Sequence, residues 1–134
     1  MNKETLRNYL CIGKEINLLR LEIERLRSSL QAVPQLSDMP RGGAGEHDRT
    51  ASTIAKIVDT EMILDGKINE YIIIRQQIEE SIKTLPSNLR LLLRLRYIEG
   101  YRWEKIAVEM NYAWAQVHRL HGQALQTLHK DDTK

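Results

Sequence analysis

Three side chains near the C-terminus could read the bases of DNA: Gln116, His118 and Arg119. An arginine can donate two hydrogen bonds to guanine, and a glutamine can make a matching pair with adenine. A histidine can reach a base or a phosphate. The three residues stand close together in the chain, so one end of a single helix could present them. Their types and spacing indicate recognition of a nucleic acid.

The segment that contains them, Trp103–Leu120, matches a helix-turn-helix motif. Ala107 is the small residue needed where the two helices approach, and Asn111 tolerates the positive φ of the turn. The positions that must bury the inner helix faces are all apolar: Ile106, Met110, Tyr112, Val117 and Leu120. We therefore expect the second helix to enter the major groove of DNA.

This motif predicts two sets of DNA contacts. The candidate base-facing residues are Trp114, Ala115, Gln116, His118, Arg119 and Gln123. The candidate phosphate contacts are Arg90, Arg94, Arg96, Arg102 and Lys105. For Trp114, a place in the core is an equally good interpretation. The two helices are expected to begin after Arg102 and Ala113, whose side chains cannot cap free backbone amides.

Two long helices are expected to precede the motif. The first, over about residues 2–32, has apolar residues spaced by threes and fours: Ile12, Ile16, Leu19, Ile23, Leu26, Leu30 and Val33. The second, over about 51–83, keeps this spacing at Ile54, Ile57, Leu64, Ile68, Tyr71, Ile78 and Ile82. Glu61 and Arg75 interrupt the second series and could pair with charges on a partner helix. Such helices can pair within one chain as a hairpin or between chains as a coiled coil.

We predict an all-α fold, with a long antiparallel helical hairpin followed by a helix-turn-helix domain. The hairpin occupies 1–84 and includes a loop at 33–50, which is rich in proline, glycine and polar residues. The DNA-binding domain occupies 85–130, begins with a helix over about 87–98, and is followed by a polar tail at 131–134. The N-terminal helices are expected to form a homo-oligomer.

The charge is unevenly distributed along the chain. The formal net charge is +2. From Lys83 onward the chain has nine Lys and Arg but only five Asp and Glu. Residues 1–82 have eleven Lys and Arg and thirteen Asp and Glu. The basic excess therefore lies with the helix-turn-helix, as a surface facing phosphates requires. A single cysteine, Cys11, excludes an internal disulfide and fits the cytoplasm. No apolar run is long enough to span a membrane.

No residue pattern indicates catalysis or metal binding. His118 and His121 can share a helix face, but zinc needs three or four convergent ligands, and His129 lies too far along the helix. His47 and Asp48 fall in the predicted loop, where a solvated position is the simpler interpretation. The chain also lacks a glycine-rich phosphate loop framed by a strand and a helix. We expect no enzymatic activity, no metal and no cofactor.

The segment LPSNLRLLLRLRYIEGYRWEKIAVEMNYAWAQVHRLHGQALQTL resembles region 4 of bacterial sigma-70 factors. The resemblance covers about a third of the chain and includes Leu85-Pro86, Leu95-Arg96-Tyr97 and Ile106-Ala107. It implies that the promoter-reading residues fall on Trp114, Ala115, His118 and Arg119. Sigma factors usually have charged or hydrogen-bonding residues at the first two of these positions. Sigma regions 2 and 3 are missing.

The whole chain is similar to small sigma-region-4-like regulators of phages and prophages, of the RinA and ArpU type. The similarity includes the loop from Met39 to Thr53 and the blocks RYIEGYRWEKIA and VHRLHGQAL. It implies transcriptional control of phage late genes, with double-stranded DNA as partner and RNA polymerase as a second candidate partner. Two alternatives remain open. One is a DNA-packaging component similar to a small terminase subunit, and the other is a helical interaction module that does not bind DNA.

Overall fold

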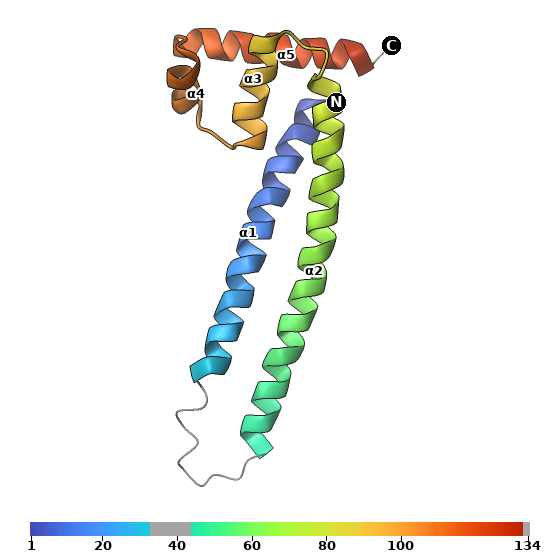
Figure 1. Ribbon diagram of the computed structural model, residues 1–134, viewed down its shortest axis with the longest axis vertical. Coiled ribbons are helices and arrows are strands. Elements are labelled where there is room, and N and C mark those ends of the chain that lie inside the picture. The colour runs from blue at the N-terminus through green and yellow to red at the C-terminus, as the bar shows by residue number, and fades with distance from the viewer. Residues whose placement is uncertain (33–43, 133–134) are drawn as a thin grey trace. The chain divides into compact units, whose positions relative to one another are not determined.

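The computed structural model describes residues 1–32 and 44–132, and every regular element in those ranges is helical. The elements are α1 (Lys3–Ala32), α2 (Ala44–Ile82), α3 (Ser87–Leu93), the π-helical turn η2 (Arg94–Ile98), α4 (Trp103–Met110) and α5 (Trp114–Asp132) (Figure 1). The predicted all-α class is confirmed. None of the described helices is both long and apolar enough to cross a membrane.

The chain forms two compact units. The helix-turn-helix unit comprises Met1–Gly13 and Glu70–Lys134, and the hairpin unit comprises Lys14–Asn69. The first unit is larger than the predicted DNA-binding domain 85–130, because it also contains the start of α1 and the end of α2. A boundary drawn at residue 84 therefore separates segments that pack together.

In the hairpin unit, α1 and α2 run antiparallel and pair within the chain. Lys67 Nζ lies 3.0 Å from Glu15 Oε2, and Arg27 Nη2 donates to Glu61 Oε1 at 2.6 Å. Three residues of the predicted apolar series are buried along this contact: Ile16, Ile23 and Ile57. Glu61, which interrupts the apolar series of α2, is thus paired with a cation of α1.

Helix α2 begins earlier than its apolar pattern predicts. The predicted loop covered residues 33–50, but residues 44–50 are already helical. A polar stretch without proline can form an exposed helical end, which apolar periodicity does not reveal. Of the predicted loop, residues 33–43 lie outside the described part of the chain, as does Val33 of the first apolar series.

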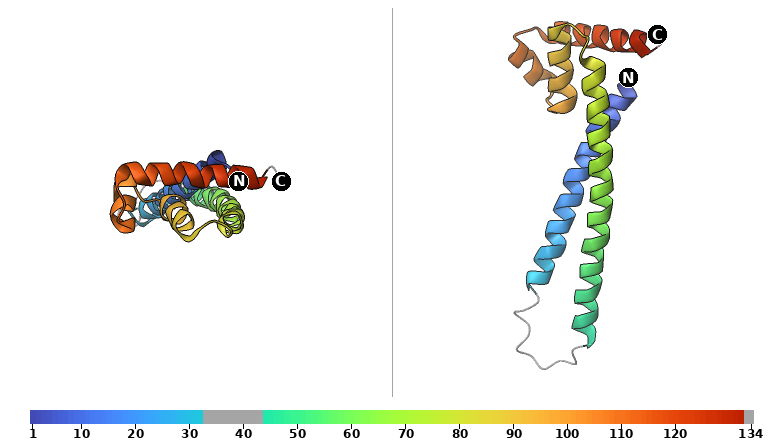
Figure 2. Two further views of the ribbon diagram at one scale, coloured as in Figure 1. Left: turned by 90° about the horizontal axis from the view of Figure 1, so that it is seen from above. Right: turned by 45° about the vertical axis from the view of Figure 1, so that its right-hand side comes forward.

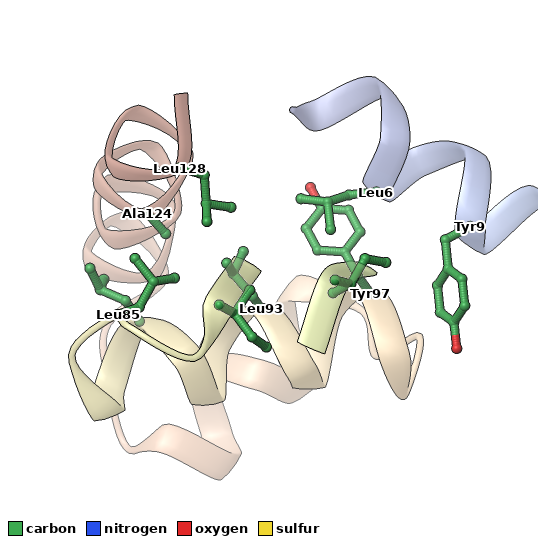
Figure 3. Packing of buried hydrophobic residues seen from close by; sticks show 10 residues of the cluster. Leu6, Tyr9, Leu85, Leu93, Tyr97, Ala124 and Leu128 are labelled. Atoms are coloured by element: carbon green, nitrogen blue, oxygen red, sulfur yellow. The ribbon is translucent and has the colours of Figure 1, made fainter. Parts of the chain in front are cut away.

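The main core of the helix-turn-helix unit gathers side chains from both ends of the chain (Figure 3). Leu6 and Tyr9 of α1 are 0% and 1% exposed. The other buried members of this core are Ile78, Ile82, Leu85, Leu89, Leu93, Tyr97, Ala124 and Leu128. The start of α1 is therefore part of the same core as α3 and α5, which pack on each other (Figure 2).

A pair of stacked tyrosines joins α1 to α2 inside this unit. The rings of Tyr9 and Tyr71 are 4.2 Å apart and nearly parallel, at 10°. Gly13 lies beside them, and a Cβ atom at that position would stand 3.3 Å from the Tyr71 ring. The small residue on α1 thus leaves room for the aromatic ring of α2.

The predicted helix over 87–98 is helical throughout but changes its hydrogen-bonding pattern after Leu93. In η2 the amide of Glu99 donates to Arg94 O at 2.9 Å, and the amide of Tyr101 donates to Leu95 O at 2.9 Å. Gly100 then adopts a φ of 72°, which a side chain would strain. The chain turns there toward α4.

Replacing Leu6 with alanine tests whether the start of α1 belongs to this core. We expect Leu6→Ala to lower the free energy of unfolding by about 2–5 kcal/mol, because it leaves a cavity in a fully buried site. Leu91→Ala on α3 is the matched control, since Leu91 is 46% exposed, and it should change stability by less than about 1 kcal/mol. Urea unfolding measures both, and similar losses would contradict the assignment.

Candidate nucleic-acid interface

A second core cluster holds α4 and α5 together. Leu92, Ile106 and Val117 are its buried residues. The partly buried side chains packed against them include Ala107, Met110, Tyr112 and Leu120. Every position that the motif requires to be apolar therefore packs in this cluster, and the predicted pair of helices with its intervening turn is confirmed as a local structure.

The turn between α4 and α5 depends on Asn111. Its φ of 57° and ψ of 44° lie in the left-handed region, and it is the one non-glycine residue of the described chain with a positive φ. The amide of the next residue, Tyr112, donates to Ala107 O at 3.0 Å. Asparagine tolerates this conformation better than most residues, so the predicted role of Asn111 is confirmed.

The residues that precede α4 and α5 do not cap these helices with their side chains. Arg102, with φ −69° and ψ 154°, precedes α4 and makes no capping hydrogen bond through its side chain. Ala113 precedes α5 and has no side-chain acceptor. The free amides of the first turn of α5 therefore remain available to an external acceptor such as a phosphate oxygen.

One face of α5 is exposed along its first half. Ala115, Arg119, Gly122 and Gln123 lie on it at intervals of three or four residues. Within the described part of the chain, the Arg119 guanidinium makes no hydrogen bond or ion pair. Its N–H donors can therefore bind an external group with two parallel hydrogen bonds.

The other candidate base-facing residues differ in their exposure. Trp114 is 56% exposed, so it lies at the surface and not in the core. Gln116 is half-buried. His118 is also half-buried, because its ring lies against two indoles, with centroids 4.6 Å from Trp103 and 4.0 Å from Trp114. His118 thus lies at the edge of the exposed face, among aromatic rings.

The candidate phosphate contacts fall into two groups. Arg102 and Lys105 are exposed, and Lys105 Nζ lies 3.8 Å from the centre of the Tyr101 ring. Arg94, in contrast, donates from Nη1 to Glu79 Oε1 at 2.9 Å and from Nη2 to the other oxygen of the same carboxylate. This bidentate pair neutralises Arg94 within the protein.

Arg90 and Arg96 are partly occupied by protein groups. Arg90 Nη1 donates to Lys83 O at 3.5 Å. Arg96 Nη1 donates to Tyr101 O at 3.0 Å, and its guanidinium lies 4.4 Å from the centre of the Trp103 ring. Neither arginine is paired with a carboxylate of the described residues, so the charge of each is available to an external anion.

Gly122 is a residue of the exposed face that the motif did not indicate. A Cβ atom at this position would meet nothing within 4 Å. A glycine inside a helix costs about 1 kcal/mol relative to alanine. Packing among the described residues does not explain why this position is a glycine. A glycine in the middle of the predicted DNA-facing helix is the sequence feature that could have indicated a functional role.

His121 is buried on the opposite side of α5. Its Nε2 atom lies 2.7 Å from the hydroxyl of Tyr97. Burial first, and then the positive charges of Lys3 and Arg96, lower the pKa of His121 from 6.5 to about 4. His121 is therefore a neutral core residue at pH 7. No cluster of three or more candidate metal ligands is present among the described residues.

The buried His121 predicts a pH-dependent stability. The unfolded chain takes up a proton near pH 6.5 and the folded chain only near pH 4, so stability is complete above pH 6.5 and declines as the pH falls. The loss across this window amounts to about 3 kcal/mol. Urea unfolding between pH 7 and pH 4 measures it.

The controls are two glutamine variants on the same helix. His121→Gln should lower stability at pH 7 but remove most of the pH dependence. His129→Gln, at an exposed position, should keep the wild-type pH dependence. An unchanged slope in His121→Gln would show that another group is responsible.

Comparison of the chain with protein families, curated proteins and solved structures finds no match. The geometry of α4 and α5 and the pattern of free cations around them therefore carry the functional argument.

Proposed function

We propose that this protein is a sequence-specific DNA-binding regulator of transcription for phage or prophage genes. In this proposal, α5 lies in the major groove and reads bases with its exposed face. The observation that carries the proposal is Arg119, an exposed arginine without a partner among the described residues, on the second helix of a well-packed helix-turn-helix. Arginine on such a helix is the commonest reader of guanine.

The electrostatics of the chain support this proposal. The excess of positive charge falls after Lys83, in the segment that carries α4 and α5. Arg102 and Lys105 stand exposed at the start of α4, where they could contact the DNA backbone. The uncapped amides at the start of α5 could donate hydrogen bonds to a phosphate oxygen. Arg94 has a different role in this proposal, because its pair with Glu79 joins η2 to α2.

Binding selection on genomic DNA at physiological salt tests this function. The wild-type protein should enrich one sequence motif, and Arg119→Ala should relax the motif at one position, costing about 1–3 kcal/mol of discrimination against the wrong base. Arg20→Ala is the matched control, since Arg20 is an exposed arginine of α1, and its motif should be unchanged.

The alternatives give different results in the same experiment. A helical interaction module would enrich no motif and show no salt-dependent binding to DNA. If Arg119→Ala weakened binding to all sequences equally, Arg119 would be a phosphate contact and base reading would belong to other residues.

Gly122 provides an independent test of the DNA-facing surface. Gly122→Ala should raise the free energy of unfolding by up to about 1 kcal/mol, because alanine favours the helix. It should also weaken specific DNA binding, since the added methyl group would occupy space between α5 and the groove. Gly66→Ala on α2 is the control, because a Cβ atom there also meets nothing within 4 Å. If Gly122→Ala bound specific DNA with unchanged affinity, DNA would bind to a different surface of the protein.

We further propose that the hairpin unit brings copies of the chain together. Its described residues include six large apolar side chains with exposures of 46–69%: Leu18, Leu21, Ile54, Val58, Met62 and Ile63. Such a concentration of exposed apolar surface is unusual in a monomer and favours burial against a partner. A second copy offers the same surface, so the contact would be self-complementary.

Light scattering after size-exclusion chromatography tests the oligomer. We expect a dimer for the wild type, and a shift to monomer for Met62→Glu, because a carboxylate would be buried without a partner. Asn17→Glu adds the same charge at an exposed polar position and should leave the dimer intact. A monomeric wild type would contradict the proposal, and a closed ring of many subunits would favour a DNA-packaging role. The resemblance to sigma region 4 makes RNA polymerase a further candidate partner of the DNA-bound form.

A further inference from the structure

A small cavity opens between α1, η2, α4 and α5 inside the helix-turn-helix unit. Its volume is about 200 Å³. The residues that line it are Lys3, Arg7, Leu10, Arg96, Tyr97, Trp103, His118 and His121. These residues come from the first turns of the chain and from its C-terminal half, so the cavity exists only where the two segments meet.

The charges around this cavity are all positive. Lys3, Arg7 and Arg96 line it, and no carboxylate from residues 1–32 or 44–132 does. Within the described residues, none of the three forms an ion pair with an acidic side chain. Arg96 is held in place by the carbonyl of Tyr101 and by the Trp103 ring. Three cations thus surround one space without an internal counter-charge.

A polar atom without a partner adds to this pattern. His118 Nε2 is buried, and none of the described residues offers it a hydrogen bond. The other histidine of the cavity, His121, already has Tyr97 as its partner. A buried polar atom without a hydrogen bond costs free energy, so an external acceptor at His118 would be favourable.

The lowered pKa of His121 has the same positive charges among its causes. After burial, the charges of Lys3, Arg96, His118 and Arg7 are the causes that lower its pKa. Side chains of α1, η2 and α5 therefore all disfavour a positive charge on the His121 ring. A negative charge placed there would experience the opposite effect and be stabilised.

The size of the cavity limits what it can hold. A volume of about 200 Å³ corresponds to roughly seven water molecules at about 30 Å³ each. It is smaller than the range of about 300–1,000 Å³ typical of sites for larger organic ligands. A compact anion with several acceptor oxygens fits both this volume and the arrangement of donors.

We propose that this cavity binds an oxyanion of the phosphate type, with Lys3, Arg7 and Arg96 balancing its charge and His118 Nε2 donating a hydrogen bond. Arginine and lysine are the side chains that proteins use most for phosphate. The phosphate can belong to a small free molecule or to the backbone of DNA, since both present the same oxygens. The site does not depend on the proposed DNA-binding function.

Thermal unfolding with inorganic phosphate tests the site directly. Phosphate should raise the melting temperature of the wild type above that in sodium chloride of equal ionic strength, because it binds the folded state alone. Lys3→Gln/Arg7→Gln should raise the half-saturating phosphate concentration at least about tenfold, because two charge-assisted hydrogen bonds are lost. Lys14→Gln/Arg20→Gln removes two exposed cations of the same helix that do not line the cavity and should respond as the wild type does.

A second measurement uses the wild-type protein alone. The imidazole nitrogen signals of His118 should shift on addition of phosphate and remain in place in chloride of equal ionic strength. Equal melting temperatures in phosphate and chloride, or equal phosphate responses in both double variants, would overturn the proposal. So would His118 signals that do not move.

Competition with duplex DNA identifies the source of the phosphate. If inorganic phosphate binds the cavity and displaces DNA more strongly than chloride at equal ionic strength, the site receives the DNA backbone. If it binds without displacing DNA, the site receives a free anion. Both results support the oxyanion site, and a protein that binds phosphate but no DNA would separate this site from the proposed regulatory function.

Discussion

The burial of Leu6 and Tyr9 among the C-terminal helices is the contact on which the helix-turn-helix unit depends. These two side chains of α1 share one core with Ile78 and Ile82 of α2 and with Leu128 of α5. Because α5 packs in this core through Ala124 and Leu128, its exposed face is oriented by helices that lie far apart in the sequence. The unit therefore contains more than the helix-turn-helix motif. Its scaffold also includes the start of α1 and the end of α2.

Local patterns in the sequence predict what depends on near neighbours. The spacing of apolar residues along α1 and α2 predicts two long helices that pair, and the buried Ile16, Ile23 and Ile57 confirm it. The left-handed conformation of Asn111 is also predictable, since a turn of this length between two short helices requires it. These features need only the preferences of individual residues and the periodicity of a helix.

Contacts between distant segments could not be predicted in the same way. Nothing near Lys3 or Arg7 indicates that they line a cavity with His118. The charge pattern also does not distinguish Arg94, which is bound by Glu79, from Arg119, which has no partner in the described part of the chain. An arginine in a sequence carries a charge, but its role depends on whether the fold brings a carboxylate to it. The π-helical turn η2 could not be predicted either, because its residues are equally compatible with an α-helix.

The shared core of the helix-turn-helix unit also has a consequence for how the chain folds. Leu6 belongs to a core that also contains Leu128, so this core is complete only after α5 has been synthesised. Leu6 and Leu128 lie far apart in the sequence, and closing so long a loop slows folding relative to a bundle with local contacts. A fragment that starts at residue 85 would lack the core side chains of α1 and α2, and would leave one side of this core uncovered. The C-terminal helices therefore need Leu6 and Tyr9 of α1 to complete their hydrophobic core.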